Sequence, residues 1–346
     1  MSAMTTIKTS IRLFIAAIFL PLAFSGMMYI GSTTAYTWGV FDEAGFHQQY
    51  SDGIYKYRVL GRESLVYFQG LIEKGVLGGF SPGVFKADLN VQSAWYAAHF
   101  YNNSLYLCLA CCLLFFIFEG HRNNRYSQVE LPLLGMSLLM TLTQYVVVPY
   151  DTLSYLFLLL GVLLSFTLPQ SLFTVFLLAV TVAVATLNRE TSFLIISFYV
   201  AVNYKSVLLH NPFKGLSKQQ WAVLLLCLAF FSAYLSLRFY YGFQQALYHD
   251  VQIFQSFRIF AILGLLFMFL LLINVFLTAP VSAEMKAFML TSAPYSIMII
   301  LVAMPNEMRL WIPILLPLLI LKLAADKDVD DAENKKTLES AMLNSK

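Results

Sequence analysis

The sequence predicts an all-α polytopic membrane protein with about ten transmembrane helices. Three observations support this fold class. The 346 residues are 59% hydrophobic and only 12% charged, whereas about 25% of an ordinary soluble domain is charged. The mean hydropathy is +0.70, and apolar runs long enough to cross a bilayer recur along the chain. So few charges cannot give a chain of this size a polar surface, which excludes a cytosolic globular enzyme, a disordered chain and a nucleic-acid-binding protein.

Apolar runs of about 20 residues, the length that crosses the hydrocarbon core as a helix, divide the chain. We expect spans at 11–31, 103–118, 129–148, 152–168, 171–187, 191–209, 220–240, 257–279, 287–304 and 309–324. Lys8 and Arg12 precede the apolar part of the first run, which has no clean small-residue cleavage site and so predicts an uncleaved signal anchor. The four cysteines lie inside apolar runs. This position is typical of packing residues and indicates neither a disulfide framework nor a zinc site.

The Lys and Arg residues set the expected orientation, because short cytoplasmic loops are enriched in them. With the N-terminus in the cytoplasm, the cytoplasmic segments hold the larger share of the basic residues, including Arg122, Arg125 and the lysines near the C-terminus. An even number of spans also returns the C-terminus to the cytoplasm. We therefore expect one transmembrane domain over 1–324 and a solvated cytoplasmic tail over 325–346.

A long first extracytoplasmic loop, about 32–100, is the one sizeable polar segment between spans. It carries acidic residues and patches with helical spacing, such as Tyr57, Leu60, Ser64, Leu65 and Phe68. This pattern predicts short amphipathic helices lying at the outer membrane interface. The Tyr and Trp residues of the loop, Tyr50 and Trp95 among them, are typical of the lipid headgroup belt.

The other outward segments are short, and each carries polar or charged residues. They are 149–151, 188–190, 240–257 and 305–309. A charge at the centre of a membrane helix costs roughly 2.5–3.5 kcal/mol on insertion scales, so charges near the bilayer pair with one another or line a wet cavity. Because all four segments fall on one side of the membrane, they predict a shared polar cavity that faces outward.

Plainer structural roles are open for single residues of these turns. Arg189 beside Glu190, or Glu307 near Arg309, also fits an ion pair at a helix end. Asp151 also fits an N-cap of the fourth span, because Asp is a favoured cap residue. The convergence of several such turns, rather than any one pair, favours a functional site.

Several short elements resemble those of bacterial membrane glycosyltransferases of the GT-C type. They are Phe41-Asp42-Glu43-Ala44-Gly45-Phe46, Tyr57-Arg58-Val59-Leu60, Tyr150-Asp151, Asn188-Arg189-Glu190-Thr191-Ser192 and Glu307-Met308-Arg309-Leu310-Trp311-Ile312-Pro313. The many spans and the large first outward loop, with an acidic residue soon after span one, are similar as well. The resemblance implies a GT-C-like fold in the bacterial inner membrane, with both termini in the cytoplasm.

The resemblance also implies a reaction. A sugar would move from a polyprenyl-phosphate donor to a hydroxyl of a glycan, lipid or protein acceptor on the extracytoplasmic face. A carboxylate then deprotonates the hydroxyl, and the resemblance favours Asp42 for this role, with Asp52 second. Ordinary loop surface is the alternative for Asp42 and its neighbour Glu43.

Arginines would stabilise the phosphate through bidentate hydrogen bonds, while polar neighbours hold the sugar or orient the arginines. The candidate binding residues are Glu43, Tyr57, Arg58, Arg62, Asp151, Asn188, Arg189, Glu190, Glu307 and Arg309. No cofactor is implied beyond the lipid-linked donor. A divalent metal held by carboxylates stays open, although the histidines show no metal-binding spacing.

Three other functions are open. A polymerase or ligase of surface polysaccharide also uses outward arginines, but a large outer loop late in the chain would favour it, and here the large loop comes first. A transporter or flippase often has helices broken in matching halves, whereas Pro294, Pro313 and Pro317 are late and unmatched. A non-catalytic assembly subunit is the fourth reading.

Overall fold

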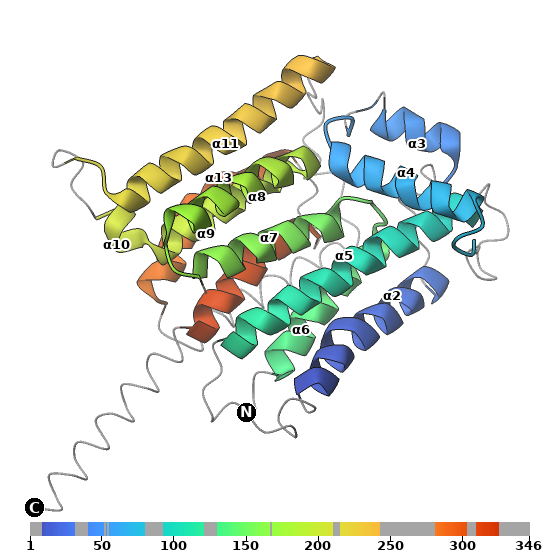
Figure 1. Cartoon of the computed structure of the whole chain (residues 1–346), viewed down its shortest axis with the longest axis horizontal. Coiled ribbons are helices and arrows are strands. Elements are labelled where there is room, and N and C mark those ends of the chain that lie inside the picture. Colours follow the sequence, from blue (N-terminus) through green and yellow to red (C-terminus); the bar gives the residue numbers. More distant parts are fainter. Residues whose placement is uncertain are drawn as a thin grey trace, which may run out of the picture. The chain divides into compact units, whose positions relative to one another are not determined.

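The computed structural model describes residues 9–31, 41–51, 53, 55–79, 93–120, 130–166, 168–209, 215–242, 281–302 and 309–324. Within these ranges the chain forms helices joined by turns, and no strand occurs (Figure 1). The all-α prediction is therefore confirmed for this part of the chain. The predicted span 257–279 and the predicted tail 325–346 lie outside the described residues.

Three of the described helices are long and apolar enough to cross a membrane: Thr9–Tyr29, Ser93–Glu119 and Lys218–Tyr241. Each coincides with, or contains, one of the predicted spans. Shorter apolar helices occupy Pro132–Leu142, Asp151–Phe166, Leu172–Asn188 and Glu190–Val202, where further spans are predicted. The length and apolar composition of these helices indicate a membrane protein, while the number of ten spans and the side on which each terminus lies stay predictions.

Contacts divide the chain into two units, the first comprising residues 1–196 and 221–249. Its helices are η1 (Phe14–Phe19), α2 (Leu20–Gly31), α3 (Glu43–Tyr50), α4 (Val59–Glu73), α5 (Ser93–Gly120), α6 (Glu130–Leu142), η4 (Thr143–Tyr145), α7 (Asp151–Phe166), α8 (Leu172–Asn188), η5 (Glu190–Ser192), the start of α9 (Phe193–Val202) and most of α11 (Lys218–Tyr241). The helix α5 is central, because η1, α2, α4, α6 and α7 all pack against it (Figure 1).

The helix α5 begins at Ser93, about ten residues before the predicted span and inside the predicted loop. The hydropathy pattern does not predict this earlier start, because Asn102 and Asn103 interrupt the apolar run. Both amides are buried but hydrogen-bonded: Asn102 donates to the carbonyl of Pro149 at 3.1 Å, and Asn103 donates to the side chain of Gln144 at 2.9 Å. Polar groups satisfied in this way are tolerated inside a helical bundle, so the helix continues through them.

Several aromatic residues of the predicted first loop, Tyr50 and Trp95 among them, belong to a hydrophobic core. Tyr50 and Trp95 are 1% and 4% exposed, so the headgroup prediction is wrong for both. Phe46 lies between them, with its ring centroid 4.4 Å from that of Trp95 and 5.2 Å from that of Tyr50. These rings pack with Tyr150 in one hydrophobic cluster, which fixes α3 against the turn before α7.

The helix α4 is amphipathic, as predicted. Leu65 is fully buried, whereas Val66 and Tyr67 on the other face are exposed. Its Ser64 hydroxyl donates to Asn102 of α5 at 2.7 Å, so α4 packs on the first half of α5 (Figure 1). That the exposed face meets the membrane interface stays a prediction.

The second unit comprises residues 197–220 and 250–346. Its described helices are the end of α9, α10 (Tyr204–Val207), the start of α11, α13 (Ala283–Val302) and the helix 309–324. Ser197 of α9 donates to the carbonyl of Thr291 on α13 at 3.2 Å. Tyr295 of α13 donates to the carbonyl of Leu310 at 3.1 Å, which ties the last helix to α13.

Gly61 lets α4 approach the turn that precedes α7. A Cβ atom at this position would lie 2.9 Å from Cβ and 3.1 Å from Cα of Tyr150, so the substitution Gly61→Ala forces the backbone apart. We expect it to lower stability by about 1–3 kcal/mol, the usual cost of overpacking, measured as a fall in apparent melting temperature in detergent. Gly70→Ala in the same helix is the control, because nothing lies within 4 Å of its added Cβ. Equal behaviour of the two variants would contradict the close approach.

Candidate functional site

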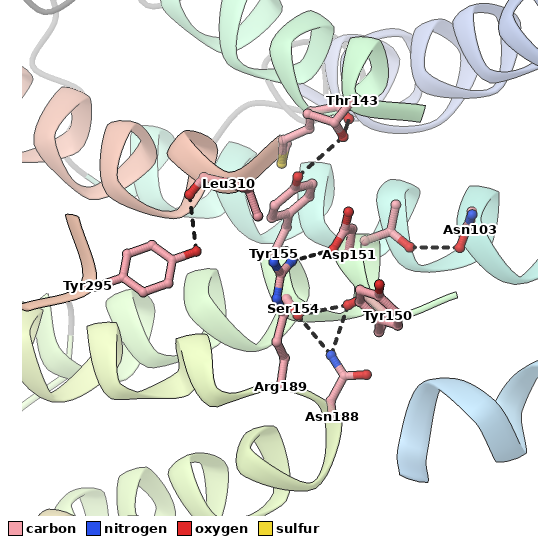
Figure 2. A network of polar contacts seen from close by, with 12 residues as sticks. Asn103, Thr143, Tyr150, Asp151, Ser154, Tyr155, Asn188, Arg189, Tyr295 and Leu310 are labelled. Carbon is pink, nitrogen blue, oxygen red and sulfur yellow. Dashed lines mark hydrogen bonds and ion pairs between the residues drawn. The ribbon is translucent and has the colours of Figure 1, made fainter. Parts of the chain in front are cut away.

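The turns before α7 and after α8 meet in a buried ion pair. Asp151 lies in the first turn of α7, and Arg189 is the C-cap of α8. The Arg189 guanidinium donates to the Asp151 carboxylate, and their side chains are 7% and 0% exposed (Figure 2). Two residues that are 38 positions apart are therefore paired, and Arg189 does not pair with its neighbour Glu190 as one prediction allowed.

Amide side chains hold the backbone around this pair. Asn188, which is fully buried, donates from Nδ2 to the carbonyl of Tyr150 and to the hydroxyl of Ser154, each at 2.9 Å (Figure 2). On the other side, Thr152 donates to Asn103 of α5 at 3.3 Å. The turn is thus fixed from both α5 and α8, so the direction of the Arg189 side chain is fixed with it.

A small pocket lies beside this ion pair, between three segments that are far apart in sequence. It is lined by Tyr57, Arg58, Thr186, Arg189, Glu190, Tyr234, Leu237 and Arg238. These residues come from the segment before α4, the end of α8 with η5, and the end of α11. The space between these side chains measures about 220 Å³, with the open solvent at its mouth included.

Tyrosine rings hold two of the pocket arginines by their flat faces. The guanidinium carbon of Arg58 lies 3.9 Å from the ring centroid of Tyr150 and 4.5 Å from that of Tyr55. The guanidinium carbon of Arg238 lies 3.7 Å from the centroid of Tyr57 and 5.1 Å from that of Tyr234. Stacking on a ring is favourable for a cation and leaves the N–H donors, which lie in the guanidinium plane, available at its edge.

The described residues that line the pocket carry a surplus of positive charge. Three of them are arginines and one, Glu190, is a carboxylate, while Asp151 is paired with Arg189. Glu190 approaches Arg238 at 3.4 Å, with its side chain 42% exposed. Arg58 forms no ion pair with any carboxylate in the described part of the chain. An arrangement of this kind attracts an anion.

The segment before α4 also binds the C-terminal end of α11 through two hydrogen bonds. Lys56 donates to the carbonyl of Tyr241 at 2.7 Å, and the Tyr57 hydroxyl donates to the carbonyl of Gly242 at 2.6 Å. Cations and donors stabilise the unpaired carbonyls at a helix end. Gly242 has φ of 78°, a left-handed conformation that favours glycine. These hydrogen bonds keep Arg238 of α11 against the ring of Tyr57, and the two residues together form one side of the pocket.

Arg62 also contacts the end of α11, but it is not among the residues that line the pocket. It donates to the hydroxyl of Tyr241 at 3.2 Å and pairs with Glu63 at 2.8 Å. Burial lowers the pKa of Arg62, but the hydrogen bonds to Tyr241 and Glu63 outweigh that effect and raise the pKa above its ordinary value. Arg62 therefore carries a permanent positive charge beside the end of α11.

The predicted site residues fall into three groups. Tyr57, Arg58, Arg189 and Glu190 line the pocket, while Asp151, Asn188 and Arg62 support it. Asp42, the N-cap of α3, and Glu43, its first residue, are not among the lining residues. Arg309 belongs to the second unit, where it is buried at the start of the helix 309–324. Asp52 and Glu307 lie outside the described residues.

Asp42 has a local structural role. Its side chain accepts a hydrogen bond from the backbone N–H of Gly45 and is the N-cap of α3. Glu43, the next residue, is exposed on the surface of α3. Asp is a favoured N-cap residue, and this role differs from the ordinary loop surface that was expected as the alternative for Asp42.

Sequence reasoning missed Arg238 and Tyr234. Both lie within or near the predicted span 220–240 and were counted as part of an apolar run. A signal was present, because an arginine inside a membrane helix is costly and faces a polar interior or a cavity by default. The position of Arg238 one turn before the end of α11 is consistent with that rule.

No family model matches this chain, and neither the curated proteins nor the solved structures compared with it give a match. Across the described residues, no three His, Cys, Asp or Glu side chains group closely enough to hold a metal ion.

Proposed function

We propose that the chain is a membrane glycosyltransferase that takes a sugar from a polyprenyl-phosphate donor on the extracytoplasmic face of the bacterial inner membrane. The observation that carries the proposal is the convergence of Arg58, Arg189 and Arg238 on one pocket, in which Glu190 is the single carboxylate among the described lining residues. Guanidinium groups bind phosphate oxygens through paired, charge-assisted hydrogen bonds. The donor phosphate would occupy the pocket, and its polyprenyl chain would lie along the apolar helices.

The arginines would act on the leaving group. An acceptor hydroxyl oxygen forms a bond to the anomeric carbon of the sugar, and the bond between that carbon and the phosphate oxygen breaks. The phosphate leaves with the bonding electron pair and gains negative charge, which the pocket guanidiniums stabilise. Donors fixed in advance at the place where charge develops are the largest single source of enzymatic rate acceleration in many enzymes. The stacked tyrosines supply that fixation for Arg58 and Arg238.

A carboxylate must accept the proton of the acceptor hydroxyl. The resemblance favours Asp42 or Asp52, but Asp42 caps α3 and is not in the pocket lining. Glu190 lines the pocket and is partly exposed to solvent. We therefore assign the base to Glu190, with Asp42 and Asp52 as the competing candidates.

The reaction is tested with membranes from cells that express the chain. Radiolabelled polyprenyl-phosphate sugars are added, and the release of polyprenyl phosphate and labelled product is measured. We expect release with at least one sugar from wild-type membranes and none from membranes that carry Arg58→Gln with Arg238→Gln. Equal release from both preparations would overturn the proposal.

The same assay separates the competing functions. Consumption of a polyprenyl-diphosphate glycan alone would identify a polymerase or ligase instead. Movement of an intact lipid-linked sugar across the bilayer, without cleavage of its phosphate bond, would identify a flippase.

Arg238→Gln is expected to weaken donor binding about tenfold or more, because a hydrogen bond to a charged group contributes about 1.5–3 kcal/mol. The measurement is a titration of the purified protein in nanodiscs with a polyprenyl-phosphate sugar. Arg12→Gln is the control: it removes the same charge from a residue that pairs with Glu119 at 4.0 Å, away from the pocket lining. A similar loss in both variants would indicate a general charge effect rather than a contact in the pocket.

A further inference from the structure

The two carboxylates near the pocket hold their arginines in very different ways. Asp151 is fully buried and tightly paired with Arg189. Glu190 lies 3.4 Å from Arg238, and its side chain is 42% exposed. A charge-assisted hydrogen bond between nitrogen and oxygen is normally about 2.7–2.9 Å long, so the contact of Glu190 with Arg238 is loose. An exposed ion pair contributes only about 0–1 kcal/mol.

The guanidinium of Arg238 is held independently of Glu190. Its face stacks on Tyr57 at 3.7 Å, and Tyr57 is fixed in turn by its hydrogen bond to Gly242. Loss of the Glu190 contact therefore leaves Arg238 in place. A carboxylate that contributes little to positioning, yet occupies a donor edge in a cationic pocket, competes with any anion that enters.

We propose that Glu190 is an exchangeable internal counter-ion, which a phosphate group bound by Arg58 and Arg238 displaces from Arg238. This inference rests on the proposed function, because it takes the ligand of the pocket to be a phosphate group. Arg189 keeps its partner Asp151 during the exchange, since that pair is buried and tight. Donor binding thus breaks one loose ion pair and leaves the buried one intact.

The exchange also changes what Glu190 can accept. In the empty pocket one carboxylate oxygen of Glu190 contacts Arg238, and the side chain is partly exposed. Once the donor phosphate has taken its place on Arg238, both oxygens of Glu190 are available to accept a hydrogen bond or a proton from an acceptor hydroxyl.

The test measures binding rather than turnover. Purified protein in phosphatidylcholine nanodiscs is titrated calorimetrically with geranyl phosphate, and geraniol serves as the uncharged probe. We expect Glu190→Gln to bind geranyl phosphate about two- to fivefold more tightly than wild type, the factor set by an ion pair of up to about 1 kcal/mol. Binding of geraniol is expected to be the same in both proteins.

Two further variants make the result specific. Glu63→Gln removes the same charge from an exposed ion pair with Arg62 outside the pocket lining, and it is expected to leave the affinity unchanged. In a protein that already carries Arg238→Gln, the additional change Glu190→Gln is expected to give no gain, because no counter-ion is left to displace.

The inference is overturned if Glu190→Gln binds geranyl phosphate no more tightly than wild type, if the gain persists without Arg238, or if wild type does not bind the phosphate at all. Its failure can be told apart from failure of the proposed function. Sugar transfer without a gain in Glu190→Gln leaves the function standing and removes the exchange. The full binding pattern without any sugar transfer keeps the exchange and removes the glycosyltransferase.

Discussion

Asp151→Asn is expected to destabilise the protein by about 3–5 kcal/mol, because it leaves the buried Arg189 guanidinium without its paired negative charge. Asn matches Asp in shape, so loss of the charge is the main change. The measurement is the apparent melting temperature of the purified protein in detergent. The fall should be much larger than that of Glu63→Gln, whose exposed pair with Arg62 contributes about 1 kcal/mol or less.

A double variant separates an orphaned charge from a general loss of packing. Arg189→Gln combined with Asp151→Asn removes both charges and leaves two neutral side chains that can hydrogen-bond. Replacing a whole buried pair is far less costly than breaking it, so the double variant should be more stable than Asp151→Asn alone. If the double variant is instead less stable than both wild type and Asp151→Asn, the ion pair makes a net contribution to stability, and the cost of Asp151→Asn does not come only from an unpaired charge.

The pairing of Asp151 with Arg189 was within reach of the sequence. Both residues lie in short turns between apolar runs of span length. Two predicted spans separate these turns, so the turns fall on the same side of the membrane. The cost of a charge near the bilayer then makes pairing or a wet cavity the expected outcome. What the sequence left open was the partner, since Glu190 stands next to Arg189 in the chain and Asp151 does not.

Other features depend on contacts that no local pattern reveals. The start of α5 at Ser93 requires Asn102 to find the Pro149 carbonyl, 47 residues away. The burial of Trp95 requires the ring of Phe46, which comes from another helix. Hydropathy treats each of these residues as polar or interfacial, because it does not include their partners. The same limit hid Arg238, whose role depends on Tyr57 and Glu190.

The assignment of the catalytic base can be decided with two conservative variants. Glu190→Gln is expected to lower the rate of sugar transfer by about 10²–10⁴-fold, the usual contribution of a general base. Asp42→Asn is expected to leave the rate within about twofold of wild type, because Asn still caps α3 through its side-chain oxygen and the cap is the contact that Asp42 makes with Gly45. Both rates are measured at saturating donor, so that a change in affinity does not enter.

The combination of readouts makes the result decisive. If Glu190 is the base, Glu190→Gln binds the phosphate probe at least as tightly as wild type but fails to transfer the sugar, which is a loss in kcat and not in affinity. If Asp42→Asn is the inactive variant while Glu190→Gln stays active, the base lies on α3 and the pocket serves only the phosphate. Because both substitutions replace a carboxylate by its amide, a difference between them reports on chemistry at the two positions rather than on the size of the side chain.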